Sequence, residues 1–212
     1  MSHPLRIANE ISSLLEFLEA GVDFIHLRKP HFDEKELEKF IHQIPEQNRK
    51  RLIVHGKVLI AEKYGLGGVH FSHENPATRD SLRSKISKSI FSTHPDDLSI
   101  IDQRYKRVFL GPVFTHTNYR SNIQWPWTDC TQEQFRRLKA SRNKCIAIGG
   151  VDLTNIQQTA EWGFNGALLY TSIWEMVESQ GMLNTLSYFE QVMGEVSSKT
   201  AKTQDSGSQI QR

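Results

Sequence analysis

Polar side chains stand at the ends of the apolar runs that the sequence predicts as strands. Five of the nine histidines close five successive runs of this kind, namely His26, His55, His70, His94 and His116. Imidazole titrates near neutral pH, so histidines at such positions can act as general acids, general bases or metal ligands. A single strand-end histidine is more often hydrogen-bonded to a neighbouring loop, but five along one edge favour a functional site. No H-x-x-x-H pair occurs on a predicted helix, which argues against zinc.

Arg28 and the glycine pair Gly149–Gly150 indicate that the ligand carries phosphate. Alternation along a strand puts Arg28 on the same face as His26, and a guanidinium can grip a phosphate with two parallel hydrogen bonds. Two glycines after the apolar run 145–148 let a ligand approach the backbone closely. Amide groups there and at Thr171, each beside a helix start, would form an anion site. For the glycine pair taken alone, a simple tight turn is an equally good interpretation.

Strands and helices that alternate along the whole chain must position these residues. Strands are expected over 22–28, 51–55, 68–71, 89–92, 107–111, 145–148 and 166–170. Helices are expected over 7–20, 33–44, 58–64, 78–85, 95–101, 132–140, 154–162 and 183–193, with Asp152 or Thr154 as the cap of the seventh. This alternation predicts parallel strands with right-handed crossovers, in a TIM (β/α) barrel or an open doubly wound sheet. Regular spacing without a dinucleotide glycine fingerprint favours the barrel.

The barrel is expected to be incomplete at its first strand. Seven strands can be counted where eight are usual, because the chain opens directly into a helix. Either the first strand is missing or Leu5–Ile7 is its remnant, and we expect a partly open barrel between the first and last strands. A single domain over 1–196 is predicted, and the polar stretch 197–212 has too few apolar residues to be ordered.

Composition excludes several classes of protein. The 26 basic and 24 acidic residues give a net charge of +2, so no basic field indicates nucleic-acid binding. Cys130 and Cys145 form neither a disulfide framework nor a metal-ligand spacing, and they fit a reducing, cytoplasmic setting. No apolar run approaches the roughly 18 residues needed to span a membrane, so no membrane association is expected.

The order of motifs resembles the thiamine phosphate synthase and TenI family of phosphate-binding TIM barrels. The matching segments are GVDFIHLRKP (21–30), GLGGVHFSHEN (65–75), SIFSTH (89–94), FLGPVF (109–114), CIAIGGV (145–151) and GFNGALLYTSIW (163–174). They follow one another in the family's order over residues 8–175, which makes the match much more specific than any single motif.

The resemblance implies two phosphorylated substrates. In the family, the synthase joins a pyrimidine carried on pyrophosphate to a thiazole phosphate, while Mg²⁺ and basic residues hold the departing pyrophosphate. By position, the thiazole-phosphate site would comprise Gly149, Gly150, Tyr170 and Thr171. Arg28 would contact pyrophosphate, and Ser92 would lie near both the pyrimidine and the pyrophosphate.

The departures from the family pattern concern the magnesium site and the pyrophosphate clamp. The family's Q-x-R-x-K is His26-Leu-Arg28-Lys29-Pro30 here, without the glutamine and with the lysine displaced by one place. The two positions at which the family has magnesium-binding aspartates are Gly56 and Asn75. Since Mg²⁺ strongly prefers charged oxygen ligands, Mg²⁺ is a doubtful cofactor and no protein metal ligand is expected.

Histidines replace other family residues. His55 stands where the resemblance expects asparagine, and His116 lies in the loop that usually reads G-P-x-F-x-T-x-T-K. His26, Arg28, His55, Ser92 and His116 are therefore the candidate catalytic residues. The histidine on which TenI-type tautomerases rely aligns with Pro112, although His116 is near.

Three functions follow from the resemblance. The first is a transferase of thiamine biosynthesis that couples thiazole phosphate to hydroxymethylpyrimidine pyrophosphate. The second is a TenI-like thiazole tautomerase, and the third is a non-catalytic or regulatory barrel that only binds a phosphorylated ligand. The expected partners are small phosphorylated thiazoles and pyrimidines, and a homodimer is possible.

Overall fold

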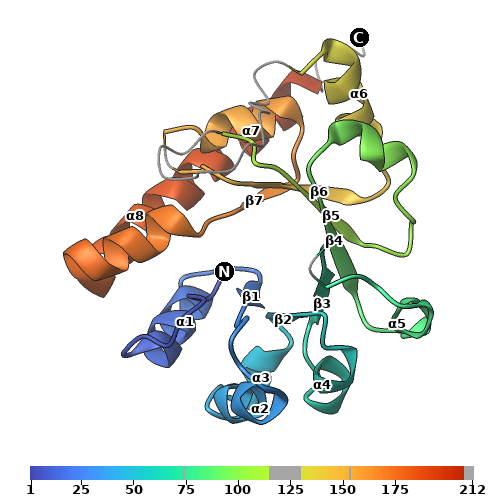
Figure 1. Ribbon diagram of the computed structural model, residues 1–212. Helices are drawn as coiled ribbons and strands as arrows, with labels where there is room; N and C mark the ends of the chain where they lie inside the picture. The colour runs from blue at the N-terminus through green and yellow to red at the C-terminus, as the bar shows by residue number, and fades with distance from the viewer. Residues whose placement is uncertain (74, 115–129, 153, 208–212) are drawn as a thin grey trace.

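The computed structural model describes residues 1–207 apart from 74, 115–129 and 153, with side chains described as far as Gly194. Within these limits the chain forms one curled sheet of parallel strands with helices between them (Figure 1). The strands are β1 (Ile25–Leu27), β2 (Leu52–His55), β3 (Gly68–Phe71), β4 (Lys88–Ser92), β5 (Arg107–Leu110), β6 (Lys144–Ile148) and β7 (Gly166–Leu168). All seven lie within the predicted ranges or extend them by one residue.

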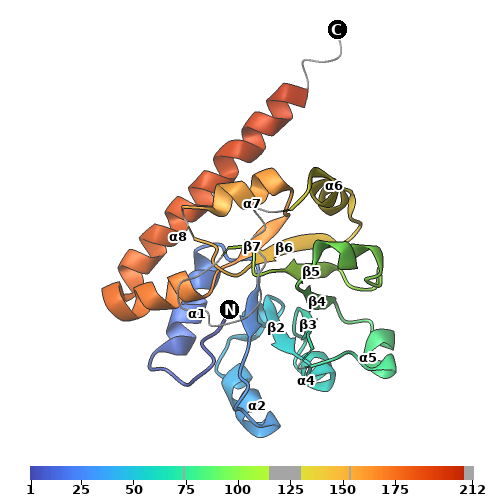
Figure 2. The same cartoon turned by 45° about the horizontal axis from the view of Figure 1, so that its top comes forward.

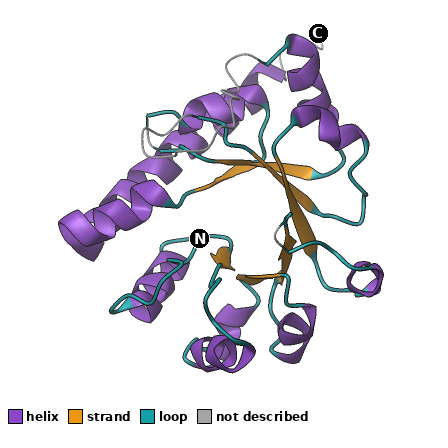
Figure 3. Ribbon diagram, viewed as in Figure 1, coloured by secondary structure: helices purple, strands orange, loops and turns teal. Residues whose placement is uncertain are grey.

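The helices pack on the outer side of the curled sheet, as Figure 3 shows. They are α1 (Glu10–Glu19), α2 (Glu34–His42), α3 (Glu46–Arg49), α4 (Val58–Lys63), α5 (Arg79–Arg83), the 3₁₀ helix η1 (Pro95–Ser99), α6 (Gln132–Ala140), α7 (Ile156–Trp162) and α8 (Thr171–Gly207). The strands follow one another in chain order across the sheet, and each pair of neighbours is parallel. The fold is therefore a TIM-like α/β barrel, as the sequence predicts.

Side-chain caps explain why several helices begin where they do. Asp33 and Thr131 each form a capping box, in which the side chain accepts from the third helical amide and the third residue bonds back to the cap. The prediction for α7 was wrong by a few residues, because Asn155 rather than Asp152 or Thr154 is its cap residue. Asp152 instead accepts from the Thr154 amide at 2.8 Å and so shapes the loop before the helix.

The apolar core has two parts. One cluster joins α1, α2 and β1–β3 with Trp174, and the other joins β5 and β6 with residues of α6, α7 and α8. Partly buried side chains of Ile90 and Ile101 pack against both clusters. The two halves of the barrel therefore meet at β4, which carries Ile90.

The barrel is open between β1 and β7, and the N-terminal residues occupy this seam. Within the described residues no strand pairing joins β1 to β7. The Met1 amine instead donates to the Leu169 carbonyl at 3.2 Å, and the Ser2 amide donates to the His26 carbonyl at 2.8 Å. Leu5–Ile7, which was considered as a remnant strand, is not a strand. Figure 1 shows the N-terminus lying between the two edge strands.

Helix α8 contains both the helix start expected beside Thr171 and the predicted segment 183–193. The two parts meet at a break at Gly181, whose φ is 78°, and the second part continues beyond the predicted segment to Gly207. Figure 2 shows it passing α7 and projecting beyond the rest of the chain. It thus includes part of the stretch 197–212 for which no order was expected, and the division into domain and tail stays a prediction. No helix in the described part of the chain is both long and apolar enough to cross a membrane.

Candidate active site

Three histidine rings meet inside the carboxyl half of the barrel. His26 of β1 lies 5.5 Å from His55 of β2 and 5.1 Å from His70 of β3, measured between ring centroids, and His55 lies 4.8 Å from His70. Phe109 of β5 contacts the rings of His26 and His70 at 4.8 and 5.0 Å. Because parallel strands point their carboxyl ends to one edge, residues from distant parts of the sequence form one cluster, here called the histidine cluster (His26, His55 and His70).

In the histidine cluster His26 and His70 are buried and His55 is half-buried, and all three rings are neutral at physiological pH. The exposed fractions of His26 and His70 are 5% and 6%. Burial lowers the pKa of both rings well below the ordinary 6.5, and the neighbouring imidazoles lower it further. Burial also lowers the pKa of His55 to about 4, helped by the positive charge of Arg28.

Two ring nitrogens of the cluster have no hydrogen-bond partner in the described structure. His70 Nδ1 is 2.9 Å from Ser89 Oγ, whereas His26 Nδ1 and His55 Nε2 are buried without a partner. A buried polar atom without a partner costs free energy unless water or a ligand supplies the bond. These two atoms can therefore bind a polar edge of a ligand or a buried water.

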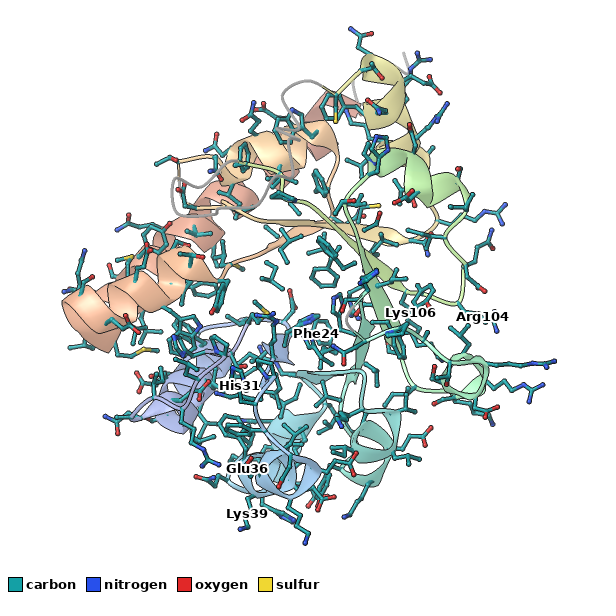
Figure 4. The ribbon with its side chains drawn as sticks, viewed as in Figure 1. Phe24, His31, Glu36, Lys39, Arg104 and Lys106 are labelled. Atoms are coloured by element: carbon teal, nitrogen blue, oxygen red, sulfur yellow. The ribbon has the colours of Figure 1, made fainter. Side chains whose placement is uncertain are left out.

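Positive groups lie at both ends of the cluster. Arg28 follows β1, and its backbone amide donates to Ser2 Oγ at 2.9 Å. At the amino end, the Arg107 guanidinium lies over the Phe24 ring, 4.0 Å from its centroid. The charge of Arg107 adds to the lowering of the His26 pKa. Phe24, labelled near the middle of the molecule in Figure 4, directly precedes β1, and Arg107 begins β5, so the pair lies at the amino ends of these strands.

Ser92, at the end of β4, is held by a local hydrogen-bond network. Its hydroxyl donates to Asp97 Oδ2 and accepts from the His94 amide at 3.3 Å. His94 in turn accepts from the Asp96 amide at its Nδ1 and is the cap residue of η1. Ser92 is therefore at the predicted edge of the barrel, but its hydroxyl proton already has an acceptor.

Gly149 and Gly150 form a turn in which a side chain at either position would strain the backbone and collide with the loop after β5. Both have positive φ, 92° and 66°, and a Cβ at Gly150 would lie 2.7 Å from the Phe114 carbonyl oxygen. A Cβ at Gly149 would press on Pro112 at the same distance. The loop after β5 packs directly against this turn, since the Phe114 amide donates to the Gly149 carbonyl at 3.1 Å.

The turns after β6 and β7 lie side by side, as the phosphate hypothesis requires. Ser172 Oγ donates to the Val151 carbonyl at 3.4 Å, which joins the start of α8 to the glycine turn. Thr171 is the first residue of α8, and Tyr170 packs against the first apolar cluster. The amides at the start of α8 and the glycine turn can together surround an anion.

The two positions where aspartates were expected converge, but they carry no carboxylate. A Cβ at Gly56 would lie 3.0 Å from the Cβ and Oδ1 of Asn75, so the positions are neighbours. Gly56 also has a φ of 69°, a backbone conformation that disfavours aspartate. Among the residues that the structure describes, no group of three histidine, cysteine or acidic side chains is arranged to hold a metal. These residues do not fit a directly coordinated Mg²⁺.

Lys29 does not take part in this site. Its ammonium group forms an ion pair with Glu10 Oε2 at 2.5 Å, and the two side chains are 1% and 3% exposed. It also donates to the carbonyls of His3 and Leu5, at 2.7 and 2.9 Å. The displaced lysine of the motif thus ties the N-terminal segment to the end of β1.

The structure brings some predicted site residues together and leaves others apart. His26, Arg28 and His55 lie together, while Ser92 and the glycine turn follow other strands at the same edge of the barrel. His116 lies outside the described residues. The prediction noted His70 at a strand end but did not include it among the site residues. The sequence signal was that His55 and His70 stand near the ends of consecutive predicted strands, which pair in parallel and set the two histidines side by side.

A comparison with models of protein families shows which family the chain belongs to. The family model TMP-TENI, thiamine monophosphate synthase, matches residues 3–173 and therefore includes every strand of the barrel. The chain belongs to this family. It thus shares its ancestry with thiamine biosynthesis enzymes, as the motif order indicated.

Comparisons of this thiamine monophosphate synthase family member with individual proteins agree with the family assignment. The chain is 25% identical to a thiamine-phosphate synthase of Psychrobacter sp. over 177 residues, which cover 77% of this chain and 79% of the relative. A crystal structure of thiamine phosphate pyrophosphorylase from Bacteroides thetaiotaomicron superimposes with a TM-score of 0.76 at 22% identity, covering 92% and 94% of the two chains. The corresponding protein from Pyrococcus furiosus gives 0.70 at 17% identity, covering 90% and 92%. The two structures support the fold.

Proposed function

We propose that this family member is a transferase that joins a pyrimidine, carried on pyrophosphate, to a thiazole phosphate. The single observation that carries the proposal is the position of Arg28 beside neutral imidazoles at the carboxyl edge of the barrel. The charge of Arg28 is close enough to lower the pKa of His55. Family membership supplies the reaction class, and the glycine turn supplies a second anion site.

In the proposed reaction, the bond between the pyrimidine's methylene carbon and the pyrophosphate oxygen breaks. The same carbon forms a bond to the thiazole nitrogen, and pyrophosphate leaves with the electron pair. Arg28 would stabilise the negative charge that develops on the leaving group. His26 and His55 would bind the polar edge of the pyrimidine through the ring nitrogens that have no partner among the described residues. Gly149, Gly150 and the start of α8 would hold the thiazole phosphate.

Magnesium would contribute less to the reaction in this protein than in a site where aspartates bind the ion directly. Gly56 provides no side chain, and Asn75 provides a neutral amide. Any Mg²⁺ would therefore be held by phosphate oxygens and water. Part of the charge neutralisation would be left to Arg28.

The histidine cluster also favours one alternative, a thiazole tautomerase. Its buried rings are neutral at physiological pH, and a neutral imidazole can accept a proton from carbon or return one. A tautomerase would need such proton transfer, whereas the coupling reaction needs mainly charge stabilisation. A protein that only binds a phosphorylated ligand is the remaining alternative.

A thiochrome assay tests the proposal. Purified protein is incubated with hydroxymethylpyrimidine pyrophosphate and thiazole phosphate, with Mg²⁺ in one series and with EDTA in another. Thiamine phosphate is then oxidised to its fluorescent thiochrome. We expect protein-dependent product. No product, together with retained binding of thiazole phosphate in calorimetry, would overturn the transferase proposal in favour of the tautomerase or the binding protein.

Replacing Arg28 with alanine should weaken pyrophosphate binding more than about tenfold, because a charged hydrogen bond to phosphate is lost. Thiazole phosphate should bind unchanged. Isothermal titration calorimetry with each ligand measures both affinities. Arg6→Ala is the matched control, since Arg6 is exposed and pairs with Glu36 at 2.7 Å. Equal pyrophosphate affinity in the two variants would remove Arg28 from the site.

Replacing Gly150 with valine should abolish thiazole phosphate binding, because the new side chain fills the turn that would hold the phosphate. The change also strains the backbone, at a cost of about 1–3 kcal/mol. Gly163→Val is the control for strain, because Gly163 has a φ of 102° but lies between α7 and the start of β7, away from the carboxyl ends of the strands. If both variants lose thiazole phosphate equally, the effect is strain and the assignment of Gly150 is wrong.

A further inference from the structure

The amino ends of β5 and β6 carry a concentration of positive charge that the proposed function does not use. The stretches 98–107 and 137–144 contain a single acidic residue, Asp102. Their basic residues are Arg104, Lys106, Arg107, Arg137, Lys139, Arg142 and Lys144. The chain as a whole is nearly balanced, with 26 basic and 24 acidic residues, so the excess is local.

The fold brings the two stretches together. The Lys144 amide donates to the Lys106 carbonyl at 3.0 Å, and Arg142 Nη1 donates to Gln103 Oε1 at 3.4 Å. Asp102 is already bound by Arg104, whose Nε donates to Oδ2 at 2.9 Å. Lys106, Arg142 and Lys144 are exposed, and none of them forms an ion pair with a carboxylate of the described residues.

A buried lysine beside this surface responds to its charge. Lys88 begins β4, is 5% exposed, and donates to the Ile86 carbonyl at 3.0 Å. Burial lowers the pKa of Lys88, and the charges of Arg104 and Lys106 lower it further. The Glu62 carboxylate opposes this effect, and Arg104 and Arg137 are paired with Asp102 and with Asp96 and Glu133, so the charge left unpaired among the described residues of the surface rests on Lys106, Arg142 and Lys144.

A small cavity opens within the basic surface, between the ends of η1 and α6. Its volume is about 310 Å³. Leu98, Ile101 and Ala140 supply apolar wall, and Gln103, Arg142 and Asn143 line it together with them. The space suits one apolar side chain or a small ligand, at the lower end of the range for binding pockets.

We propose that this basic surface docks an acidic segment of a partner protein, with one apolar anchor side chain in the cavity. The lysines at the strand starts lie outside the cavity lining, so a small anion bound there would leave their charge unused. Nucleic acid fits less well, because single strands bind by stacking on exposed aromatic rings. Tyr105, the aromatic residue of the two stretches, is only 6% exposed. Charge complementarity together with an aliphatic cavity favours a peptide.

Docking here would not obstruct the proposed active site. The surface is at the amino ends of the strands, whereas Arg28 and the glycine turn are at the carboxyl ends. The inference is therefore independent of the reaction that the barrel performs.

Fluorescence anisotropy of the full-length protein tests the docking surface with two labelled peptides. One has a central leucine flanked by glutamates, and the other has serine in place of the leucine. We expect saturable, salt-sensitive binding of the leucine peptide with a Kd below about 100 μM. The Arg142→Glu/Lys144→Glu variant should bind at least about tenfold more weakly. The matched control is Lys35→Glu/Lys39→Glu on α2, where Lys39 lies well away from Arg104 and Lys106 (Figure 4).

Two further comparisons separate the explanations. Ala140→Phe fills the cavity, so the leucine peptide should then bind no more tightly than the serine peptide. The salt dependence of peptide binding should be unchanged. Equal weakening by both charge-reversal variants would overturn the proposal, and so would the absence of saturable binding. Tighter binding of a single-stranded oligonucleotide of equal charge would replace the peptide with nucleic acid. The thiochrome assay on Arg142→Glu/Lys144→Glu should be unchanged from the parent, so failure of docking and failure of the transferase proposal are read independently.

Discussion

Lys29→Met should lower the free energy of unfolding by about 3–5 kcal/mol. The substitution leaves the Glu10 carboxylate buried without its cation, and this carboxylate is only 3% exposed. It also removes the donor to the carbonyls of His3 and Leu5. Urea unfolding followed by circular dichroism measures the change. Since a domain is stable by only about 5–15 kcal/mol, this single substitution removes a large share of the total.

Two controls identify the cause of that loss. Lys57→Met removes an exposed pair, in which Lys57 and Glu34 are 42% and 69% exposed, and should cost less than about 1 kcal/mol. The double variant Lys29→Met/Glu10→Leu should be more stable than Lys29→Met, because no buried charge remains. A loss below about 1 kcal/mol for Lys29→Met would show that the pair contributes little to stability.

Lowering the pH from 6.5 to 4 should unfold the protein through its histidine cluster. The unfolded chain binds protons below the ordinary histidine pKa of 6.5, whereas the folded cluster resists them. The stability that these groups contribute is therefore fully present above pH 6.5 and is lost as the pH falls. For His55 the loss ends near its folded pKa of about 4. Each ring contributes about 1.4 kcal/mol per pH unit, so three together contribute up to about 4 kcal/mol per pH unit.

The groups that face the cluster increase this effect. Arg28 and Arg107 each lower the pKa of a ring in the cluster, and among the described residues no carboxylate acts in the opposite direction. Burial also lowers the pKa of the Met1 amine to about 5, so this group adds to the loss of stability as the pH falls. His26→Gln should reduce the slope by about 1.4 kcal/mol per pH unit, because glutamine does not titrate. His42→Gln, at an exposed position in α2, should leave it unchanged. Chemical denaturation at a series of pH values measures the slopes, and equal slopes for the two variants would contradict the prediction.

The strands can be predicted from the sequence more accurately than the side-chain contacts that form between them. Short apolar runs that end in polar residues define all seven strands, because buried parallel strands need a continuous apolar sequence. The capping boxes at Asp33 and Thr131 define helix starts by local hydrogen bonds alone. Residues 95–101 were predicted as a helix, but η1 is a 3₁₀ helix that ends at Ser99. Helix α3 was missed, because its four residues are too few for a periodic pattern.

The site could be predicted only in part, because its chemistry depends on long-range contacts. Strand-end positions in the local sequence predicted that His26, Arg28 and His55 would lie close together, and the structure places them so. The ion pair that removes Lys29 from the site joins residues 19 positions apart and depends on how the N-terminal segment folds back. The neutral state of the cluster likewise depends mainly on burial by residues of separate strands, which no single motif specifies.

The two apolar clusters that meet at β4 divide the core of the barrel into two units of packing. Arg28, His26 and His55 belong to strand ends of the first unit, whereas Gly149 and Gly150 follow β6 in the second. A pair of substrates bridging these positions would therefore link the units as a cross-link does. Without substrates, each unit can open by local unfolding at a lower cost than the whole chain. If the proposed sites hold the two substrates, their binding would thus also determine how rigidly the two halves are held together.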